Sequence, residues 1–305
     1  VELDVSGNAF SGVIPETIGF LVKLTSLKLA QNQFSGSLPS SIGKLVSLQA
    51  MSVSRNQLDG FIPSSLNDLV DLRRMDLSCN RFSGAIPPLG SMRSMHSLDA
   101  GYNRLEGELH AELPLLLSQL TLRGNKLNGS LPAKLNSLKK LSVLDLASNS
   151  LSGSVDSALF GHSSLQQINL SNNSFSALSV PNLAGTTTQM VSVDISFNRI
   201  SGSLPANFAS IKSLAALYLR HNLFQGPIPA EYGKKAAIEG SENMIPLSRL
   251  YLDSNYLSGD VPADFLGISP EKFSGSFADN CLDECPARIP LCQGGQRPSS
   301  ECRRA

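Results

Sequence analysis

Residues 27–39 read LKLAQNQFSGSLP and combine, in thirteen residues, features that no single strand or helix accommodates. Leu27 and Leu29 alternate with a polar residue, which is typical of a short strand with one buried face. Asn32 follows, and its side-chain amide can both donate and accept hydrogen bonds at a turn. Gly36 then permits a second turn, and a proline closes the stretch. The stretch therefore predicts one coil of a chain that turns repeatedly.

The same pattern recurs along most of the chain. Each copy is marked by one asparagine, and these are Asn8, Asn32, Asn56, Asn80, Asn103, Asn125, Asn149, Asn173, Asn198, Asn222 and Asn255. A single copy buries too little apolar surface to offset the entropy lost in ordering its own backbone, so the copies must stack on one another. We expect one continuous solenoid over residues 1–268, with about eleven repeats and with stacked asparagines tying each coil to the next.

The repeated pattern LxxLxLxxNxFSGxIPxxL resembles the plant-specific type of leucine-rich repeat. The resemblance implies an α/β solenoid, that is, a right-handed superhelix with a parallel β-sheet on its concave face and often a second sheet. It also implies an extracellular location, either at the outer face of the plasma membrane or secreted into the apoplast. Members of the family are chiefly receptor-like kinases, receptor-like proteins and secreted defence proteins.

Cysteines are concentrated at the end of the chain. Cys79 stands alone, whereas the last 25 residues hold Cys281, Cys285, Cys292 and Cys302. Such clustering indicates disulfides and an oxidising compartment, and the spacing does not fit the paired CxxC motifs of a zinc site. The stretch NCLDECPARIPLC also resembles the cysteine-bearing C-terminal cap of such ectodomains. We expect residues 269–305 to form a cap with two disulfides in any of three pairings, and Cys79 to remain a free thiol.

The beginning of the chain shows no cap. Val1 falls in the middle of a repeat, because Leu3 occupies the second leucine position of the LxxLxLxxN pattern. A bare solenoid end exposes core leucines and strand edges, so we expect further repeats or a cap upstream. The chain has no run of eighteen apolar residues, so we expect contact with a membrane only through a segment absent from it.

Composition and motifs argue against several classes of protein. The 25 basic and 25 acidic residues cancel, which disfavours a nucleic-acid partner. The motifs of common hydrolases and nucleotide-binding enzymes are missing, so we expect no enzyme activity, no cofactor and no metal. Asp76 and Asp99 fall in neighbouring strands, but aspartate is common at this turn of the family, and Arg74 and Arg81 are placed to neutralise the pair.

Two further features concern loops and glycans. Residues 230–246, AEYGKKAAIEGSENMIP, lengthen one repeat by nine residues. Some family members carry a ligand-binding island between repeats, but a small polar insert on the non-strand side favours a longer convex loop. Asn128, Asn169 and Asn172 begin N-x-S sequons and are candidate glycosylation sites.

The outward residues of the last three strands differ from the rest because aromatic and basic side chains gather there. They are Phe197, Arg199, Tyr218, Arg220, His221, Arg249, Tyr251 and Tyr256. Aromatic residues and arginine dominate binding hot spots, and the repeat places Tyr218 and Tyr251 side by side. We expect a non-enzymatic recognition domain of a receptor-like kinase or receptor-like protein, which binds a peptide or protein ligand and a co-receptor ectodomain. The alternative is a secreted inhibitor of a pathogen cell-wall-degrading enzyme, similar to polygalacturonase-inhibiting proteins.

Overall fold

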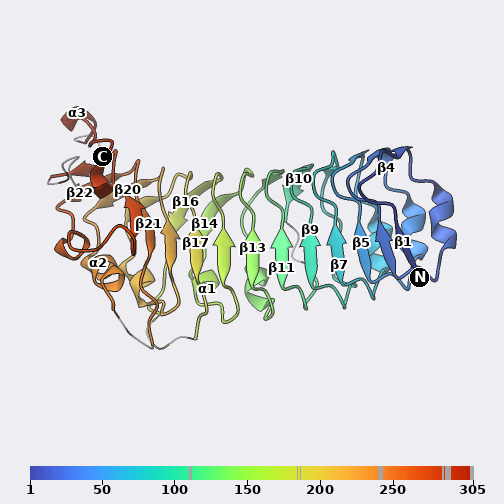
Figure 1. Ribbon diagram of the computed structural model, residues 1–305, viewed down its shortest axis with the longest axis horizontal. Helices are drawn as coiled ribbons and strands as arrows, with labels where there is room; N and C mark the ends of the chain where they lie inside the picture. The colour runs from blue at the N-terminus through green and yellow to red at the C-terminus, as the bar shows by residue number, and fades with distance from the viewer. Residues whose placement is uncertain are drawn as a thin grey trace. The chain divides into compact units, whose positions relative to one another are not determined.

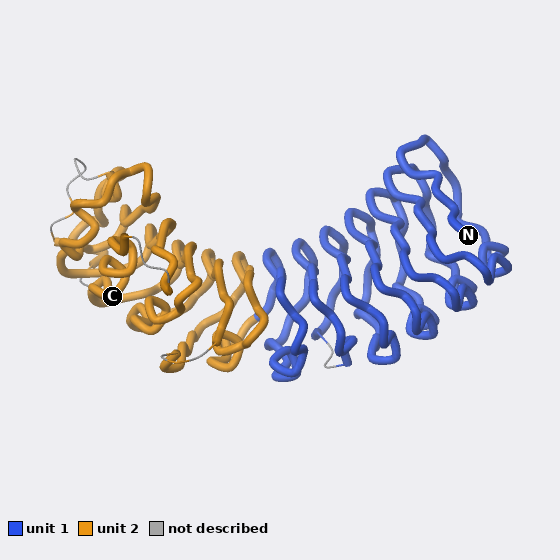
Figure 2. Tube along the Cα trace, turned by 60° about the horizontal axis from the view of Figure 1, so that its bottom comes forward, with its two compact units in different colours: residues 1–151 blue, residues 152–305 orange. Residues whose placement is uncertain are grey.

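The computed structural model describes residues 1–109, 112–183, 185, 187–239, 243–283, 285 and 290–302. The chain forms two compact units, Val1–Leu151 and Ser152–Ala305 (Figure 2). Within each unit the backbone winds through successive coils, and each coil contributes one short strand to a parallel sheet (Figure 1).

In the first unit the parallel sheet is built from strands about one repeat apart in sequence. In order across the sheet they are β1 (Glu2–Asp4), β3 (Ser26–Lys28), β5 (Ala50–Ser52), β7 (Arg74–Asp76), β9 (Ser97–Asp99), β11 (Gln119–Thr121) and β13 (Val143–Asp145). Shorter sheets form around the glycine that follows each ladder position, from β2 (Ser11–Gly12), β4 (Gln33–Ser37) and β6 (Gln57–Asp59), and from β8 (Ser83–Gly84), β10 (Arg104–Glu108) and β12 (Lys126–Asn128). The 3-10 helices of this unit are η1 (Glu16–Phe20), η2 (Ser40–Lys44), η3 (Ser64–Asp68) and η4 (Ala133–Ser137).

The second unit repeats this plan. Its strands of the parallel sheet are β15 (Gln167–Asn169), β17 (Ser192–Asp194), β19 (Ala216–Tyr218), β21 (Arg249–Tyr251) and β23 (Ser274–Ser276). Its shorter sheets contain β14 (Ser152–Val155) and β16 (Ser174–Leu178), and β18 (Ser201–Ser203), β20 (Leu223–Gly226), β22 (Tyr256–Gly259) and β24 (Cys281–Leu282). The helices are α1 (Ser157–Phe160), η5 (Ala206–Ser210), α2 (Ala230–Ala236), η6 (Ala263–Phe265), η7 (Pro290–Cys292) and α3 (Ser299–Cys302).

The leucine columns form the core, as the alternation predicts. In β3 the central Leu27 is fully buried while Lys28 is exposed, and Leu29 turns inward at the following bend. Residues from one strand align with the same repeat position in the next, so Leu27 is paired with Leu3 and Met51. Side chains of one column thus pack on each other from coil to coil.

The asparagines form a hydrogen-bonded ladder, which confirms the expectation that they tie the coils together. The buried Asn56 donates from Nδ2 to Leu29 O at 2.9 Å and accepts at Oδ1 from Phe34 N at 3.0 Å, and both partners belong to the preceding coil. It also donates to Val53 O and Ser54 O of its own turn. Bonds of both kinds recur at Asn32, Asn80, Asn103, Asn125, Asn149, Asn198, Asn222, Asn255 and Asn280.

The insert differs from the loop that the sequence predicts, because its first part is the helix α2. Tyr232 of this helix is fully buried and donates its hydroxyl to Pro205 O at 2.8 Å. Lys235 is also buried, and its Nζ donates to Ile211 O and Ile245 O, each at 2.9 Å. Burial lowers the pKa of Lys235 to about 8. The expectation of a loop was wrong here because a buried aromatic ring and a satisfied lysine bind the insert to the neighbouring coil.

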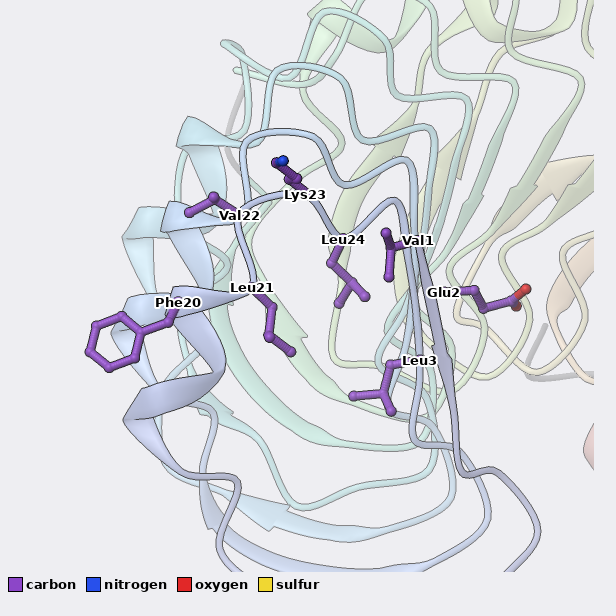
Figure 3. Close-up of a pocket in the computed structure, with 8 residues that line it drawn as sticks. All are labelled: Val1, Glu2, Leu3, Phe20, Leu21, Val22, Lys23 and Leu24. Atoms are coloured by element: carbon purple, nitrogen blue, oxygen red, sulfur yellow. The ribbon is translucent and has the colours of Figure 1, made fainter.

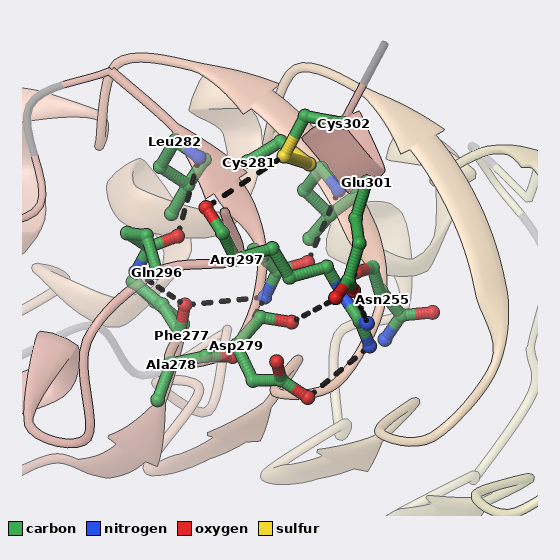
Figure 4. The surroundings of a disulfide bond; sticks show 12 residues. Asn255, Phe277, Ala278, Asp279, Cys281, Leu282, Gln296, Arg297, Glu301 and Cys302 are labelled. Atoms are coloured by element: carbon green, nitrogen blue, oxygen red, sulfur yellow. Dashed lines mark hydrogen bonds and ion pairs between the residues drawn. A yellow bond between two sulfur atoms is a disulfide. The ribbon is translucent and has the colours of Figure 1, made fainter. Parts of the chain in front are cut away.

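The end of the chain is closed by disulfides between Cys281 and Cys302 and between Cys285 and Cys292, while Cys79 remains a free, half-buried thiol. This selects one of the three open pairings. Figure 4 shows Arg297 beside the Cys281–Cys302 bridge.

Arg297 holds this region together through several contacts at once. Its Nε donates to Asn255 O at 2.8 Å and to Asp279 O at 3.1 Å, and its guanidinium pairs with the carboxylates of Asp279 and Glu301. Asn280 extends the ladder one coil beyond Asn255. The domain boundary placed at residue 268 remains a prediction.

At the first coil, apolar side chains surround an open pocket of about 460 Å³. Leu3, Leu21 and Leu24 point into the same space, whereas Phe20 and Glu2 point away from it (Figure 3). The nearby Phe34 is only half-buried and stacks on the exposed Phe10.

Candidate functional site

Two tyrosines on neighbouring strands form the centre of the candidate site. Tyr218 ends β19 and Tyr251 ends β21, and the two residues are paired in the parallel register. Their rings stack with centroids 5.3 Å apart and planes 13° from parallel, which confirms that they lie side by side. The Tyr251 hydroxyl is 2.9 Å from Ser274 Oγ on β23, so this ring is held from a third strand. Stacked and tethered rings have little rotational freedom to lose when a ligand binds.

A second stacked pair lies at the bends that follow β17 and β19. The rings of Phe197 and His221 are 4.3 Å apart and 15° from parallel. Both residues have left-handed backbone conformations, with φ of 55° and 52°. Each is the residue before a ladder asparagine, and Phe197 N donates to Arg220 O at 2.9 Å. The bend that follows each strand therefore places these two rings next to each other.

Arg220 joins the two pairs. Its Cζ lies 5.3 Å from the centroid of the Phe197 ring and 5.8 Å from that of Tyr251. Both distances are within the range of a cation–π contact. Phe197, Tyr218, Arg220, His221 and Tyr251 are called the aromatic cluster below. It offers flat apolar faces beside a fixed positive charge.

Asp253 is a residue of this site that the sequence reasoning missed. It follows Tyr251 by two positions, and His221 N donates to its backbone oxygen at 2.9 Å. Burial raises the pKa of its carboxyl group, and the nearby charges of Arg220 and His221 oppose that rise. The alternation that selected Arg220, two residues after Tyr218, would have selected Asp253 as well.

The other predicted binding residues are not joined to the aromatic cluster by a described ring contact. Arg249 is exposed at the start of β21, two residues before Tyr251, so alternation places it on the same side of the sheet. Arg199 is exposed just before β18. Tyr256 lies instead on β22, where the Arg297 guanidinium covers its ring at 4.6 Å. Tyr256 thus helps to attach the end of the chain.

Asp76 and Asp99 stabilise the turns that follow their strands. Asp76 and Asp99 are paired in register, as predicted. Asp76 Oδ1 accepts from the backbone nitrogen and hydroxyl of Ser78, and Asp99 Oδ1 accepts from Gly101 N. Burial, together with the charges of Asp76 and Asp145, raises the pKa of Asp99.

The arginines expected to neutralise this pair do not do so in the part of the chain that the structure describes. Arg81 donates to Gln57 instead, at 3.3 Å, and the described ion pairs do not include Arg74. Nor does any group of three or more His, Cys, Asp or Glu side chains among the described residues have the arrangement of a metal site.

The three sequon asparagines differ in accessibility. Asn128 is exposed at the end of β12, and Asn172 is exposed at a bend. Asn169 is half-buried, and its Oδ1 accepts from the backbone nitrogen and the hydroxyl of Ser171. Glycosylation remains a prediction for all three, and these contacts favour Asn128 and Asn172 over Asn169.

The comparisons with known proteins agree with the repeat architecture. The family model described as Leucine Rich Repeat matches residues 1–21, 23–45, 47–69, 71–91, 164–185 and 189–211. No curated protein sequence matches the chain significantly. None of the described helices has the length and apolar character needed to cross a bilayer. The matched segments are leucine-rich repeats, and the neighbours of the chain among solved structures include receptors of plants.

Three of these neighbours show how far the likeness extends. A TDR receptor is 28% identical over 97% of this chain, with a TM-score of 0.83, and the match covers 50% of the receptor chain. The plant peptide hormone receptor RGFR1, solved in complex with RGF2, is 26% identical over 92% of this chain and 48% of its own, with a TM-score of 0.78. The Arabidopsis receptor kinase HAESA, solved with the peptide hormone IDA and the co-receptor SERK1, is 25% identical over 97% of this chain and 61% of its own, with a TM-score of 0.62. The chain thus spans about half the length of the first two.

Proposed function

We propose that this chain is a peptide-recognition region of a plant cell-surface receptor, acts outside the cell and is not an enzyme. The observation that carries the proposal is the aromatic cluster, in which Tyr218 and Tyr251 stack while Arg220 lies beside two rings. Rigid aromatic faces next to a guanidinium are the groups that most often supply binding energy at protein surfaces.

The geometry favours an extended peptide segment over a compact small molecule. Tyr218, Arg220 and Tyr251 come from two adjacent strands, and alternation places Arg249 on the same side, two residues before Tyr251. A peptide crossing these strands would place apolar side chains on the rings and an acidic group near the guanidinium.

The structural neighbours support a receptor over a secreted enzyme inhibitor. The TDR, RGFR1 and HAESA structures are all described as receptors, and two of them contain a peptide hormone. Because HAESA was also solved with a co-receptor, a partner ectodomain is part of the proposal. The exposed Arg249 is a candidate for that contact, since it is not committed to the aromatic cluster.

Selection from a random peptide display library tests the proposal without a known ligand. Peptides selected on the unmodified protein are titrated against Tyr218→Ala, Arg220→Ala and Tyr251→Ala. Truncating a central anchor of this kind costs about 2 kcal/mol, or roughly 30-fold in Kd. The matched control is Tyr102→Ala in the first unit, because Tyr102 also packs beneath an arginine, with Arg123 Cζ 5.5 Å from its ring.

The expected result is loss of peptide binding in the three cluster variants and normal binding by the control. Selected peptides that bind all three variants as tightly as the unmodified protein would place the site elsewhere. Equal losses in Tyr102→Ala would also refute the assignment.

A further inference from the structure

The first unit contains a polar pocket at the beginning of three neighbouring strands, β7, β9 and β11. Its volume is about 600 Å³, and it is lined by Arg73, Arg74, His96, Ser97, Ser118 and Gln119. The sheet register places Arg74, Ser97 and Gln119 in one row. The residues before them form a second row through backbone bonds from His96 N to Arg73 O at 2.9 Å and from Ser118 N to His96 O at 2.8 Å. The repeat itself thus brings six side chains, far apart in sequence, to one place.

The basic side of this pocket carries charge that is not matched by acids. Arg73 and Arg74 are exposed, and among the described residues neither guanidinium lies within 4.0 Å of a carboxylate oxygen. Asp76 and Asp99, one row further along the strands, accept hydrogen bonds from their own turns. Two adjacent guanidinium groups without ion pairs favour an anionic ligand, and their planar donors suit a carboxylate or sulfate group.

The remaining lining residues offer both donors and acceptors. His96 Nδ1 is 2.6 Å from Ser94 O, so this nitrogen carries the hydrogen and Nε2 is the ring atom left for a ligand. Ser118 donates its hydroxyl to His96 O at 2.8 Å, which leaves oxygen lone pairs to accept. Ser97 donates to Gln119 Oε1 at 3.4 Å, so the Gln119 amide nitrogen still has hydrogens to give.

We propose that this pocket binds an anionic carbohydrate, in which an acidic group meets Arg73 and Arg74 and ring hydroxyls meet Ser97, Ser118 and Gln119. The described lining includes no aliphatic side chain, and its one aromatic ring is the His96 imidazole. An acidic peptide would find no large apolar side chain there on which to anchor, whereas a sugar acid presents hydroxyl groups that can pair with Ser97, Ser118 and Gln119. The site lies in the first unit and uses no residue of the aromatic cluster. The proposal for this pocket is therefore independent of the proposed peptide site.

A calorimetric titration with a trisaccharide of galacturonate tests the proposal at low ionic strength, where charged contacts are least screened. The matched ligand is its full methyl ester, which keeps the ring hydroxyls and removes the charge. A sulfated trisaccharide shows whether sulfate replaces carboxylate. We expect the acid to bind at least 10-fold more tightly than the ester, and the double variant R73Q/R74Q to bind the acid at least 10-fold more weakly than the unmodified protein.

The control variant is R81Q/R104Q, which removes the same charge from two exposed arginines of the first unit outside the pocket. It is expected to bind the acid like the unmodified protein. Equal binding of acid and ester, or equal losses in the two double variants, would overturn the proposal. So would tighter binding of a synthetic acidic peptide of the same charge as the trisaccharide. Circular dichroism of each variant confirms that these surface changes leave the fold intact.

Discussion

Replacing Asn56 by alanine tests whether the asparagine ladder holds the coils together. The change removes the only described hydrogen-bond partner of Phe34 N and three bonds donated to Leu29 O, Val53 O and Ser54 O. A buried N–H left without a partner costs about 1–3 kcal/mol, and the Phe34 N–H is part-buried. The three carbonyls lose less, because each keeps another donor.

The donors that remain for these three carbonyls limit the stability lost in Asn56→Ala. Leu29 O still accepts from Asn32, Val53 O from Asn80, and Ser54 O from Gln31 N. We therefore assign each of these three losses about 0.5 kcal/mol, the low end for a hydrogen bond. The total expected loss in the free energy of unfolding is about 2.5–4.5 kcal/mol.

The matched control is Asn8→Ala. Asn8 is exposed and donates only to Val5 O and Ser6 O within its own turn, so its replacement is expected to cost less than about 1 kcal/mol. Asn56→Asp adds a second test, because it keeps an acceptor for Phe34 N but places a second oxygen against three carbonyls. It is expected to be at least as unstable as Asn56→Ala.

Urea unfolding followed by far-ultraviolet circular dichroism measures these differences. Equal stabilities of Asn56→Ala and Asn8→Ala would show that the ladder contributes little. So would a loss below about 1 kcal/mol at Asn56, since the missing partner of Phe34 N alone accounts for more.

Three further predictions concern the disulfides, the buried lysine and the free thiol. Replacing Cys281 and Cys302 together by alanine should destabilise the end of the chain by about 3 kcal/mol, from the loop of 21 residues that the bond closes, as measured by thermal unfolding. Because the folded pKa of Lys235 is about 8, below its usual 10.5, the unfolded chain binds more protons between these values. The free energy of unfolding should therefore rise from pH 8 to 10.5 more steeply in the unmodified protein than in Lys235→Met. Alkylation under denaturing conditions without reductant should modify Cys79 alone, and a mass spectrum showing five modified cysteines would contradict the disulfides.

The repeated coils could be predicted from the sequence because they depend on local spacing. Leu27, Leu29 and Asn32 each occupy a position that recurs at nearly constant steps, so one stretch determines the others. The stacking of Tyr218 on Tyr251 followed from the same spacing. The interpretation of this stack as a binding site remains a proposal.

The other features could not be predicted because they depend on contacts between residues with no fixed spacing. The helix in the insert is held by Tyr232 and Lys235, whose partners lie in the preceding coil. Four cysteines permit three pairings, and the choice depends on how the end of the chain folds. Arg297 covers the ring of Tyr256, which by residue type alone was a binding candidate.

The residue before each ladder asparagine adopts a left-handed backbone conformation, and many different side chains are compatible with the fold at this position. Different residue types occupy it with φ between 52° and 58°, namely Gln31, Arg55, Cys79, Tyr102, Ser148, Asn172, Phe197, His221, Ser254 and Asp279. Glycine, which adopts this conformation without strain, occurs there at Gly7 and Gly124.

At the other positions a non-glycine residue gives up about 1 kcal/mol of stability. In return, each coil presents one side chain, next to the sheet, that can change without disturbing the leucine core. Phe197 and His221 are two such side chains. A repeat of this kind can acquire a new binding specificity by single substitutions in one column, while the asparagine beside it preserves the backbone.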